Sequence, residues 1–298
     1  MEKQNKKVTI LVCVHKKDPY TRNEGVYKAI QVGKALHPEL DLGYIYDNEG
    51  ENVSDKNPKW CELSALYWGW KNLKNVEYAG LCHYRRYFDI EITEENIDQL
   101  LKNKDILVLE RWLEHCNLAT RFMELVSMED FYLYLNALLR LHPEYKDAVL
   151  DYCYNSNMFY RCTMFVAKKE IYDDFCETFF PVFFELDKTL LAHGYNRLNR
   201  AIAYLGELSL GIYITHKKLK PRFVPMKFYP DNTIKLTPWR KLRNCIHIVK
   251  CKVGFRLLNG RHKDLYLYEA VTLALKGQGI VIENAYNSGN AYHSIYPQ

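Results

Sequence analysis

The chain has 298 residues, of which 48% are hydrophobic and 26% charged, and this balance is typical of an ordinary globular protein. Its length suits one α/β domain, or one domain with an appendage. The net charge of +5 is uneven, because the segment between Asp231 and Asp264 holds nine basic residues and no acidic one, which leaves 32 basic and 36 acidic residues elsewhere. This larger, acidic part disfavours a protein that binds nucleic acid along a basic face.

Short apolar runs alternate with helical patterns along the chain. The runs predict buried strands at Val8–Val14, Leu42–Tyr46, Tyr78–Cys82, Ile106–Leu109 and Thr163–Ala167, and a short edge strand at Arg222–Pro225. The patterns predict helices at Trp60–Leu73, Glu94–Lys102, Met128–Leu141, Lys169–Leu191 and Asn196–Ile214, and a helical tail from Pro238 onward. This order predicts an α/β fold with a mostly parallel sheet that is flanked by helices.

The N-terminal run and the cysteines bear on the cellular compartment. Val8–Val14 is short, ends in charged residues and lacks a small-residue cleavage site, so we expect a first strand and not a signal peptide. The nine cysteines include no C-x-x-C pair and no spacing typical of a zinc site, which favours reduced core residues in a cytosolic protein. No stretch approaches the ~20 apolar residues of a membrane span.

Three polar clusters follow predicted strands. They are His15-Lys16-Lys17, Asp47-Asn48-Glu49-Gly50 and His83-Tyr84-Arg85-Arg86. Ligands of open α/β sheets bind beyond the carboxyl ends of the strands, so the three clusters are expected to face one crevice. The second cluster suits either an ordered turn or a loop over a nucleotide or sugar. His15 and Lys16 suit either uracil and phosphate contacts or solvated loop charges.

The two adjacent arginines suit a diphosphate ligand, because each guanidinium offers a planar fork of donors and keeps its charge near neutral pH. Neighbouring residues of a regular strand point to opposite faces, so Arg85 and Arg86 reach one ligand only if the strand breaks there. The alternative is that one arginine binds the ligand and the other pairs with a helix carboxylate.

The chain resembles the bacterial capsular-polysaccharide glycosyltransferases that are catalogued as a domain of unknown function. The resemblance covers roughly residues 8–225 and is carried by the blocks YKAIQVGKAL, YDNEGENVSDKNPKWCELSALYWGWKN, YAGLCHYRRYF, HPEY, NMFYRCTMFVAKKEIYDDFCETFF and FFELDK. It implies a GT-A-like fold and a UDP-sugar donor, and some members of the family are similar to galactofuranosyltransferases. It also implies transfer of a sugar, galactofuranose or galactose, to a lipid-linked or oligosaccharide acceptor in surface-glycan synthesis.

Many GT-A enzymes carry a metal-binding Asp-x-Asp motif where this chain has His83-Tyr84-Arg85-Arg86. Fixed cationic side chains can take over the metal's role on the departing UDP, so we expect no required metal or other cofactor. The expected catalytic residues are Glu207, Arg85, Arg86 and His83, and the expected donor-binding residues are His15, Lys16, Asp47, Asn48, Tyr84 and Arg200.

A later block of the family has an Arg followed seven residues later by a Glu, with a Gly between them. Arg200 and Glu207 fit this pattern, whereas Ala203 stands where the glycine is expected. Both residues fall on roughly one face of a helix, so Glu207 is either the general base for the acceptor hydroxyl or an ion-pair partner of Arg200. Asn157 and Met158 are expected on the acceptor side of the site.

The domain boundary is expected near residue 230, with a glycosyltransferase domain over 1–230 and a basic helical extension over 231–298. An apolar stripe of the extension is formed by Trp239, Leu242, Ile246, Val249 and Val253. Arg240, Arg243, Lys250 and Lys252 lie mostly off this stripe. This arrangement predicts a helix at the inner face of the cell membrane, on anionic lipid, or else a helix packed on the domain or on a second subunit.

Two other functions remain open from the sequence. One is a non-catalytic UDP-binding member of a capsule-assembly complex. The other is an RNA-binding protein, because the HYRRYF stretch mixes arginines with aromatic residues, although the acidic body of the chain argues against it.

Overall fold

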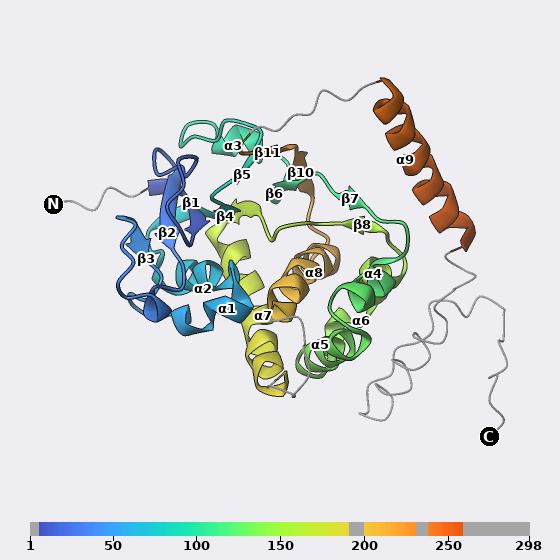
Figure 1. The fold of residues 1–298 in the computed structure, drawn as a ribbon, viewed down its shortest axis with the longest axis horizontal. Coiled ribbons are helices and arrows are strands. Elements are labelled where there is room, and N and C mark those ends of the chain that lie inside the picture. The colour runs from blue at the N-terminus through green and yellow to red at the C-terminus, as the bar shows by residue number, and fades with distance from the viewer. Residues whose placement is uncertain (1–5, 191–199, 231–237, 259–298) are drawn as a thin grey trace.

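The computed structural model describes residues 6–190, 200–230 and 238–258 (Figure 1). Its centre is a mixed sheet in which the strands follow the order β10-β6-β9-β4-β1-β2-β3, with β5 and β11 attached beside β4. The strands of this sheet are β1 (Lys6–Val14), β2 (Tyr27–Gln31), β3 (Ile45–Tyr46), β4 (Val76–His83), β5 (Arg86–Phe88), β6 (Ile106–Leu109), β9 (Phe165–Lys168), β10 (Pro221–Val224) and β11 (Met226–Phe228). A separate two-stranded sheet pairs β7 (Trp112–Leu113) with β8 (Met158–Phe159).

The predicted α/β fold with a mostly parallel sheet is confirmed. Strands β1, β2, β3 and β4 are parallel neighbours, and β6 and β10 are parallel to each other. Strand β9 runs antiparallel between β4 and β6, so β4 and β6 point the same way. The carboxyl ends of β1, β4, β6 and β10 therefore meet at one edge of the sheet, and the chain enters β9 from that same edge.

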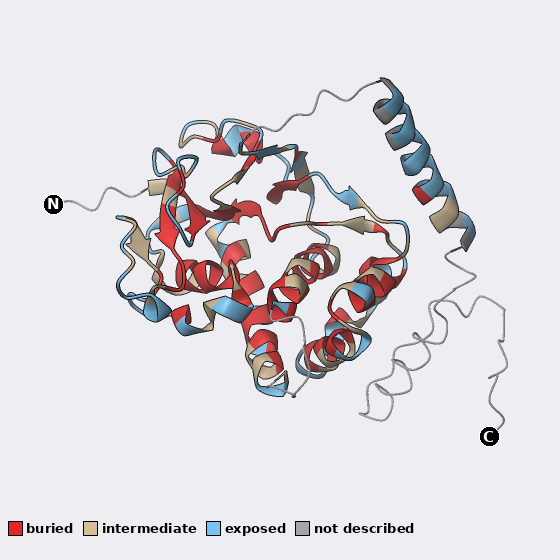
Figure 2. Cartoon of the chain, in the orientation of Figure 1, coloured by how far each residue is buried: buried red, intermediate tan, exposed pale blue. Residues whose placement is uncertain are grey.

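The helices gather mainly on one face of the sheet (Figures 1 and 2). They are α1 (Asn57–Trp60), α2 (Leu63–Asn72), α3 (Ile97–Leu100), α4 (Leu118–Leu125), α5 (Met128–Leu141), α6 (Lys146–Val149), α7 (Lys169–Thr189), α8 (Ala201–His216) and α9 (Pro238–Leu258). Helices α2 and α7 contact the sheet, and α8 packs on α7. Alternate residues of one strand serve the two faces: Leu11 joins the core under these helices, and Ile10 joins a smaller core on the other face.

Several predicted elements differ from the observed ones. The strand β2 is absent from the prediction, because Lys28 and Gln31 interrupt its apolar pattern. The predicted helix Trp60–Leu73 is divided at Cys61, whose φ of 50° lies outside the helical region. Only four residues of the predicted helix Glu94–Lys102 are helical, as α3. The predicted strand Leu42–Tyr46 is reduced to Ile45–Tyr46.

Helix α9 lies outside the layered body of the fold (Figure 1). It coincides with the start of the predicted helical tail, and the predicted boundary at residue 230 falls at the edge of a segment, 231–237, outside the described residues. The rest of the predicted extension, 259–298, also lies outside them. None of the described helices combines the length and the apolar character that a bilayer-spanning segment needs.

A close contact under the sheet edge connects α8 with the segment that leads into β9. The Tyr152 ring lies against Gly211 of α8 so closely that a Cβ atom there would overlap the ring. The Tyr152 hydroxyl oxygen in turn accepts a hydrogen bond of 2.9 Å from the Tyr160 amide.

We therefore expect Gly211→Ala to lower the free energy of unfolding by about 1–3 kcal/mol, as overpacking of a core does. The matched control is Gly254→Ala in α9, where a Cβ would meet no atom within 4 Å and helix propensity favours alanine. Urea denaturation of both variants measures the difference. Equal stability of the Gly211→Ala protein and the wild type would contradict the close contact.

Candidate active site

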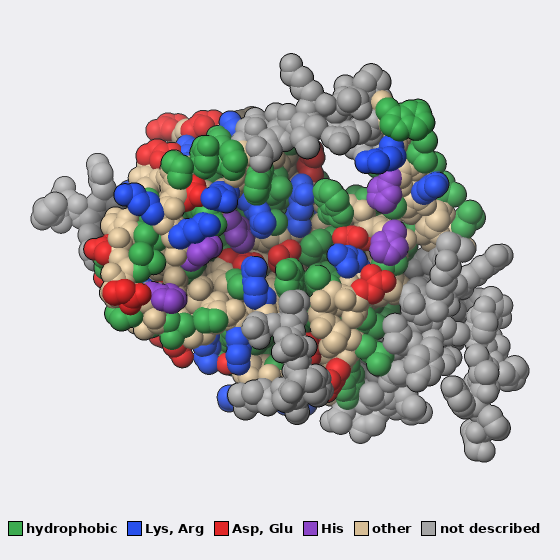
Figure 3. Space-filling model, viewed as in Figure 1, with side chains coloured by type: hydrophobic (Ala, Val, Ile, Leu, Met, Phe, Trp, Pro, Cys, Tyr) green, Lys and Arg blue, Asp and Glu red, His purple; other side chains and the backbone are tan. Residues whose placement is uncertain are grey.

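A cavity of about 400 Å³ opens at the carboxyl edge of the sheet. Its walls come from the end of β1, the start of α1, the junction of α1 and α2, the turn after β4, and the residue before α8. The lining side chains are Cys13, His15, Val32, Asn57, Pro58, Cys61, Glu62, His83, Tyr84, Arg85, Arg86, Arg200 and Phe228. On the face shown in Figure 3, basic and histidine side chains gather around acidic ones in this region. The cavity is thus strongly polar and cationic at its walls.

The turn after β4 places both arginines of the HYRR cluster on the cavity. Tyr84 and Arg85 form a two-residue turn, and His83 then pairs with Arg86 in the antiparallel strand β5. The strand therefore ends at His83, which is the condition for both arginines to reach one ligand. Arg85 also makes an ion pair with Asp18, with both Nε and Nη2 at 2.7 Å from Oδ2. Asp18 is a loop residue and is buried, so the predicted carboxylate partner exists but does not come from a helix.

Cys162 connects three of the predicted residues. Its backbone amide donates to Glu207 Oε2 at 2.8 Å, and its carbonyl oxygen lies 2.9 Å from His83 Nε2. Because a carbonyl oxygen can only accept, His83 Nε2 carries a proton. Burial lowers the pKa of His83 to about 4, so the ring is neutral at pH 7. Arg86 Nη1 lies 3.5 Å from the Cys162 sulfur.

Two neighbouring carboxyl groups have raised pKa values. Burial raises the pKa of Glu62 from its ordinary 4.5 to about 7, although Arg200 and Arg86 oppose this change. Burial also raises the pKa of Glu207 to about 7, and the nearby Glu62 charge adds to the effect. Two buried carboxyl groups that repel each other hold a proton near neutral pH, which is the behaviour expected of a general base or acid.

The backbone around these groups is strained. Cys61, Cys162 and Thr163 have φ values of 50°, 71° and 45°, in the left-handed region that side chains other than glycine and asparagine seldom adopt. Such conformations cost about 1–3 kcal/mol each and persist where the surrounding structure imposes them, often at functional sites. Here they position Glu62, which directly follows Cys61, and the Cys162 amide that holds Glu207.

The remaining predicted residues divide into two groups. Arg200 lines the cavity and donates from Nε to the Cys61 sulfur at 2.8 Å, while Glu207 bonds to Cys162, so the two do not form the alternative ion pair. His15 and Tyr84 line the cavity and meet edge to face, with ring centroids 5.3 Å apart.

Lys16, Asp47 and Asn48 are not among the residues that line the cavity. Asp47 is fully buried, and its carboxylate accepts hydrogen bonds from the Gly33 amide at 2.9 Å and the Lys34 amide at 3.1 Å. This carboxylate orders the segment after β2, which is a structural role. Lys16 and Asn48 are exposed loop residues. Their expected contacts with the donor stay predictions.

Met158 begins strand β8 of the two-stranded sheet, and Asn157 directly precedes it. Met158 pairs with Leu113, and the Asn157 side chain donates to the Glu114 carbonyl at 2.8 Å. Asn157 therefore ties β8 to the end of β7. The expected role of this pair on the acceptor side stays a prediction.

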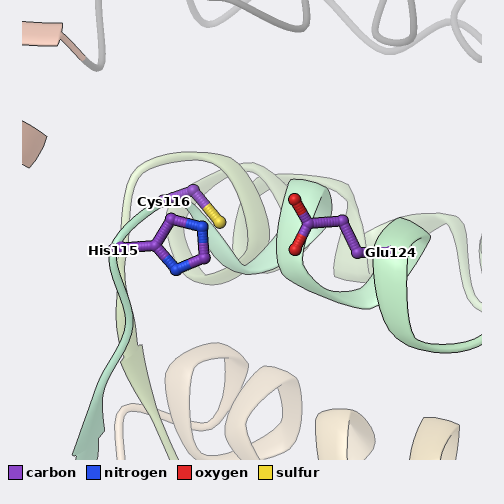
Figure 4. Close-up of side chains that lie close together, drawn as sticks. All are labelled: His115, Cys116 and Glu124. Carbon is purple, nitrogen blue, oxygen red and sulfur yellow. The ribbon is translucent and has the colours of Figure 1, made fainter.

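A group with metal-ligand character lies beyond the end of β7, and none of its residues is among those that line the cavity. One ligand atom from each of His115, Cys116 and Glu124 falls within 4.8 Å of the others (Figure 4). Two of the three residues are exposed, and structural zinc sites use four protein ligands. This group was not predicted from the sequence.

Sequence reasoning missed Glu62, Asp18 and Cys162. Glu62 opens the ELSALYWGWKN block, which was a signal, but nothing in the block shows that its first residue turns toward the HYRR cluster. Asp18 and Cys162 reach the site through loop conformations and strand order, which a single sequence does not display.

The mixed sheet with a polar cavity at its carboxyl edge defines a GT-A-like protein. A solved structure described as the WbbM bifunctional glycosyltransferase in its apo state is similar, with a TM-score of 0.69 and 26% sequence identity over 76% of this chain. The match covers 46% of that protein, so the present chain spans about half of its length. This similarity supports a glycosyltransferase-like role.

The profile of a family described as "Domain of unknown function (DUF4422)" matches residues 9–218. The chain belongs to this family, which confirms the resemblance found in the sequence. No curated protein matches the chain.

The raised carboxyl pKa values predict how stability depends on pH. Between about pH 4.5 and 7, Glu62 and Glu207 bind more protons in the folded than in the unfolded state, so their contribution to stability falls as the pH rises through this window. Glu62→Gln should make this decline shallower, by up to about 1.4 kcal/mol per pH unit for one proton.

The measurement is urea denaturation from pH 4.5 to 8, with the exposed Glu77→Gln as the matched control. The lowered pKa of His83 acts in the opposite direction, from about pH 4 to 6.5, and cancels when variant and wild type are compared. Parallel curves for Glu62→Gln and the wild type would show that Glu62 is not buried as a proton-binding group.

Proposed function

We propose that the protein is a glycosyltransferase that moves a sugar, galactofuranose or galactose, from a UDP-sugar to a lipid-linked or oligosaccharide acceptor of a bacterial surface polysaccharide. The observation that carries this proposal is a cavity lined by three arginines and by Glu62, with the buried Glu207 close to Glu62, in a chain similar to a glycosyltransferase. The sugar, the nucleotide and the pathway follow from the family resemblance.

The cationic wall suits the departing nucleotide. As the bond between sugar and diphosphate breaks, negative charge grows on the diphosphate. Arg85, Arg86 and Arg200 line the cavity, and guanidinium groups held in place stabilise such charge without reorganising. His83 is neutral and adds a hydrogen-bonding group without further positive charge. We propose that these side chains make a divalent metal unnecessary.

The carboxyl pair suits the acceptor. An acceptor hydroxyl must lose its proton as it attacks the sugar, and a base works best when its pKa is near the working pH. Glu207 is proposed as this base. The adjacent Glu62 raises the pKa of Glu207, and the Cys162 amide holds the Glu207 carboxylate in one orientation.

The arginines provide the direct test. Arg86→Ala should lower kcat by ~10²–10³-fold, as removal of one donor to a developing charge does, and Arg86→Lys should lower it less. Arg85→Ala would leave the buried Asp18 unpaired, so it is best made together with Asp18→Asn to keep the fold intact. The assay is UDP release from a panel of UDP-sugars with and without EDTA.

The control is Arg140→Ala, an exposed substitution on α5. Activity that EDTA abolishes and manganese restores would refute the metal-independent role of the arginines. Thermal stabilisation by UDP without any turnover would instead favour a non-catalytic UDP-binding protein.

We also propose a cytoplasmic protein that binds the inner face of the membrane through α9. The apolar side chains along this helix are exposed, among them Trp239 at 74%, Val249 at 59% and Leu257 at 67%. Arg243, Lys250 and Lys252 are exposed basic residues of the same helix. An exposed apolar stripe with flanking basic charge is typical of helices that lie in a lipid interface.

Val249→Glu should weaken binding of the whole protein to vesicles that contain phosphatidylglycerol by about tenfold, because one apolar side chain contributes ~1.5 kcal/mol or more. Leu141→Glu on α5, also a change of an exposed aliphatic residue to glutamate, should leave binding unaltered. Flotation measures both. A wild-type protein that ignores these vesicles, or forms a dimer through α9, contradicts the membrane proposal.

A further inference from the structure

A cluster of two arginines and two exposed aromatic rings lies outside the cavity. It consists of Arg111, Trp112, Arg161 and Phe223, called here the arginine–aromatic cluster. Trp112 is 54% exposed and Phe223 is 40% exposed, so both rings present apolar surface to the solvent. The Arg161 guanidinium lies 5.1 Å from the centre of the Trp112 ring, and the Arg111 guanidinium lies 5.1 Å from that of Phe223.

The sheet order places this cluster beside the cavity. Arg111 and Trp112 follow the carboxyl end of β6, and Arg161 stands shortly before β9, the strand between β6 and β4. Arg161 directly precedes Cys162, whose amide and carbonyl bond to Glu207 and His83. The cluster and the cavity therefore share one edge of the sheet, and Cys162 connects Arg161 with His83, which lines the cavity.

The arginines of the cluster contact aromatic rings, and no carboxylate among the described residues balances the charge of either. Arg161 Nε is buried and has no hydrogen-bond partner. An unmet buried donor is costly, so such a group indicates a ligand. Across the part of the chain that the structure describes, no carboxylate forms an ion pair with Arg111 or Arg161, whereas Arg85 has Asp18. Their positive charge is available to something that binds.

We propose that the arginine–aromatic cluster is the acceptor site, and that it takes a glycan bearing an anionic group, a phosphate or a carboxylate. The sugar ring stacks on the exposed face of Trp112, as flat rings suit the apolar face of a sugar. The anionic group meets the planar fork of Arg161, which matches phosphate or carboxylate oxygens. The acceptor hydroxyl then points past Cys162 toward Glu207. This inference rests on the proposed glycosyltransferase function.

The test begins with the full-length protein saturated with UDP, so that the donor cavity is filled. Calorimetry then measures binding of hexose 1-phosphates and hexuronic acids, with the neutral methyl hexosides as their counterparts. Comparison of the hexose 1-phosphates with the hexuronic acids shows whether the cluster binds a phosphate or a carboxylate. We expect one anionic series to bind at least tenfold more tightly than its neutral counterpart.

The variants assign this binding to the cluster. Trp112→Ala and Arg161→Gln should each weaken it by about tenfold or more, and Arg161→Lys should weaken it less, because lysine keeps the charge but loses the fork. Arg140→Gln, exposed on α5, is the matched control and should bind as the wild type does. UDP affinity should be unchanged in all four variants.

The inference would be overturned if no anionic sugar binds, or if neutral and anionic sugars bind equally. It would also be overturned if binding is undiminished in both Trp112→Ala and Arg161→Gln. Tighter binding of a single-stranded RNA oligonucleotide that depends on Trp112 would also overturn it, since bases stack on the same rings. Failure of UDP to bind the wild type refutes the proposed function instead, and the same titrations without UDP still test the cluster.

Discussion

The chain reverses direction within two residues after His83, and the candidate active site depends on this reversal. A strand that continued straight would send Arg85 and Arg86 to opposite faces of the sheet, where one guanidinium would enter a hydrophobic core. The turn brings both to one cavity instead. Arg85 then satisfies the buried Asp18, and Arg86 approaches Cys162. Fold stability and a cationic wall thus arise from the same two residues.

The site separates opposite charges in a way that suits two halves of one reaction. Cationic groups line the cavity, whereas Glu62 and Glu207 lie where burial makes their ionised forms costly. The neutral His83 lines the cavity and donates a hydrogen bond to the Cys162 carbonyl. A leaving group that gains negative charge and a nucleophile that loses a proton need these two environments, and the sheet edge keeps them adjacent.

The sequence predicts those features that local patterns determine. Helix α5 begins and ends as predicted, because the Ser127 side chain caps it and its apolar residues keep a helical period. The HYRR cluster was found because its four residues are contiguous. Glu62 and Cys162 were not predicted as site residues, because their proximity to the HYRR cluster follows from strand order and left-handed backbone conformations. Asp47 shows the converse limit, since a polar residue after a strand can also serve the fold, here by accepting a hydrogen bond from the Gly33 amide.

The strands β7 and β8 pair with each other in a sheet of their own. This small ribbon carries Trp112, while the cavity is built on the large sheet. Substitutions or insertions in the ribbon therefore leave the hydrogen-bond ladder of the large sheet intact. Under the proposed roles, this arrangement would let related chains diverge in the acceptor that they recognise while the way of handling the activated sugar stays unaltered, and the ribbon would be a short, replaceable segment for protein engineering.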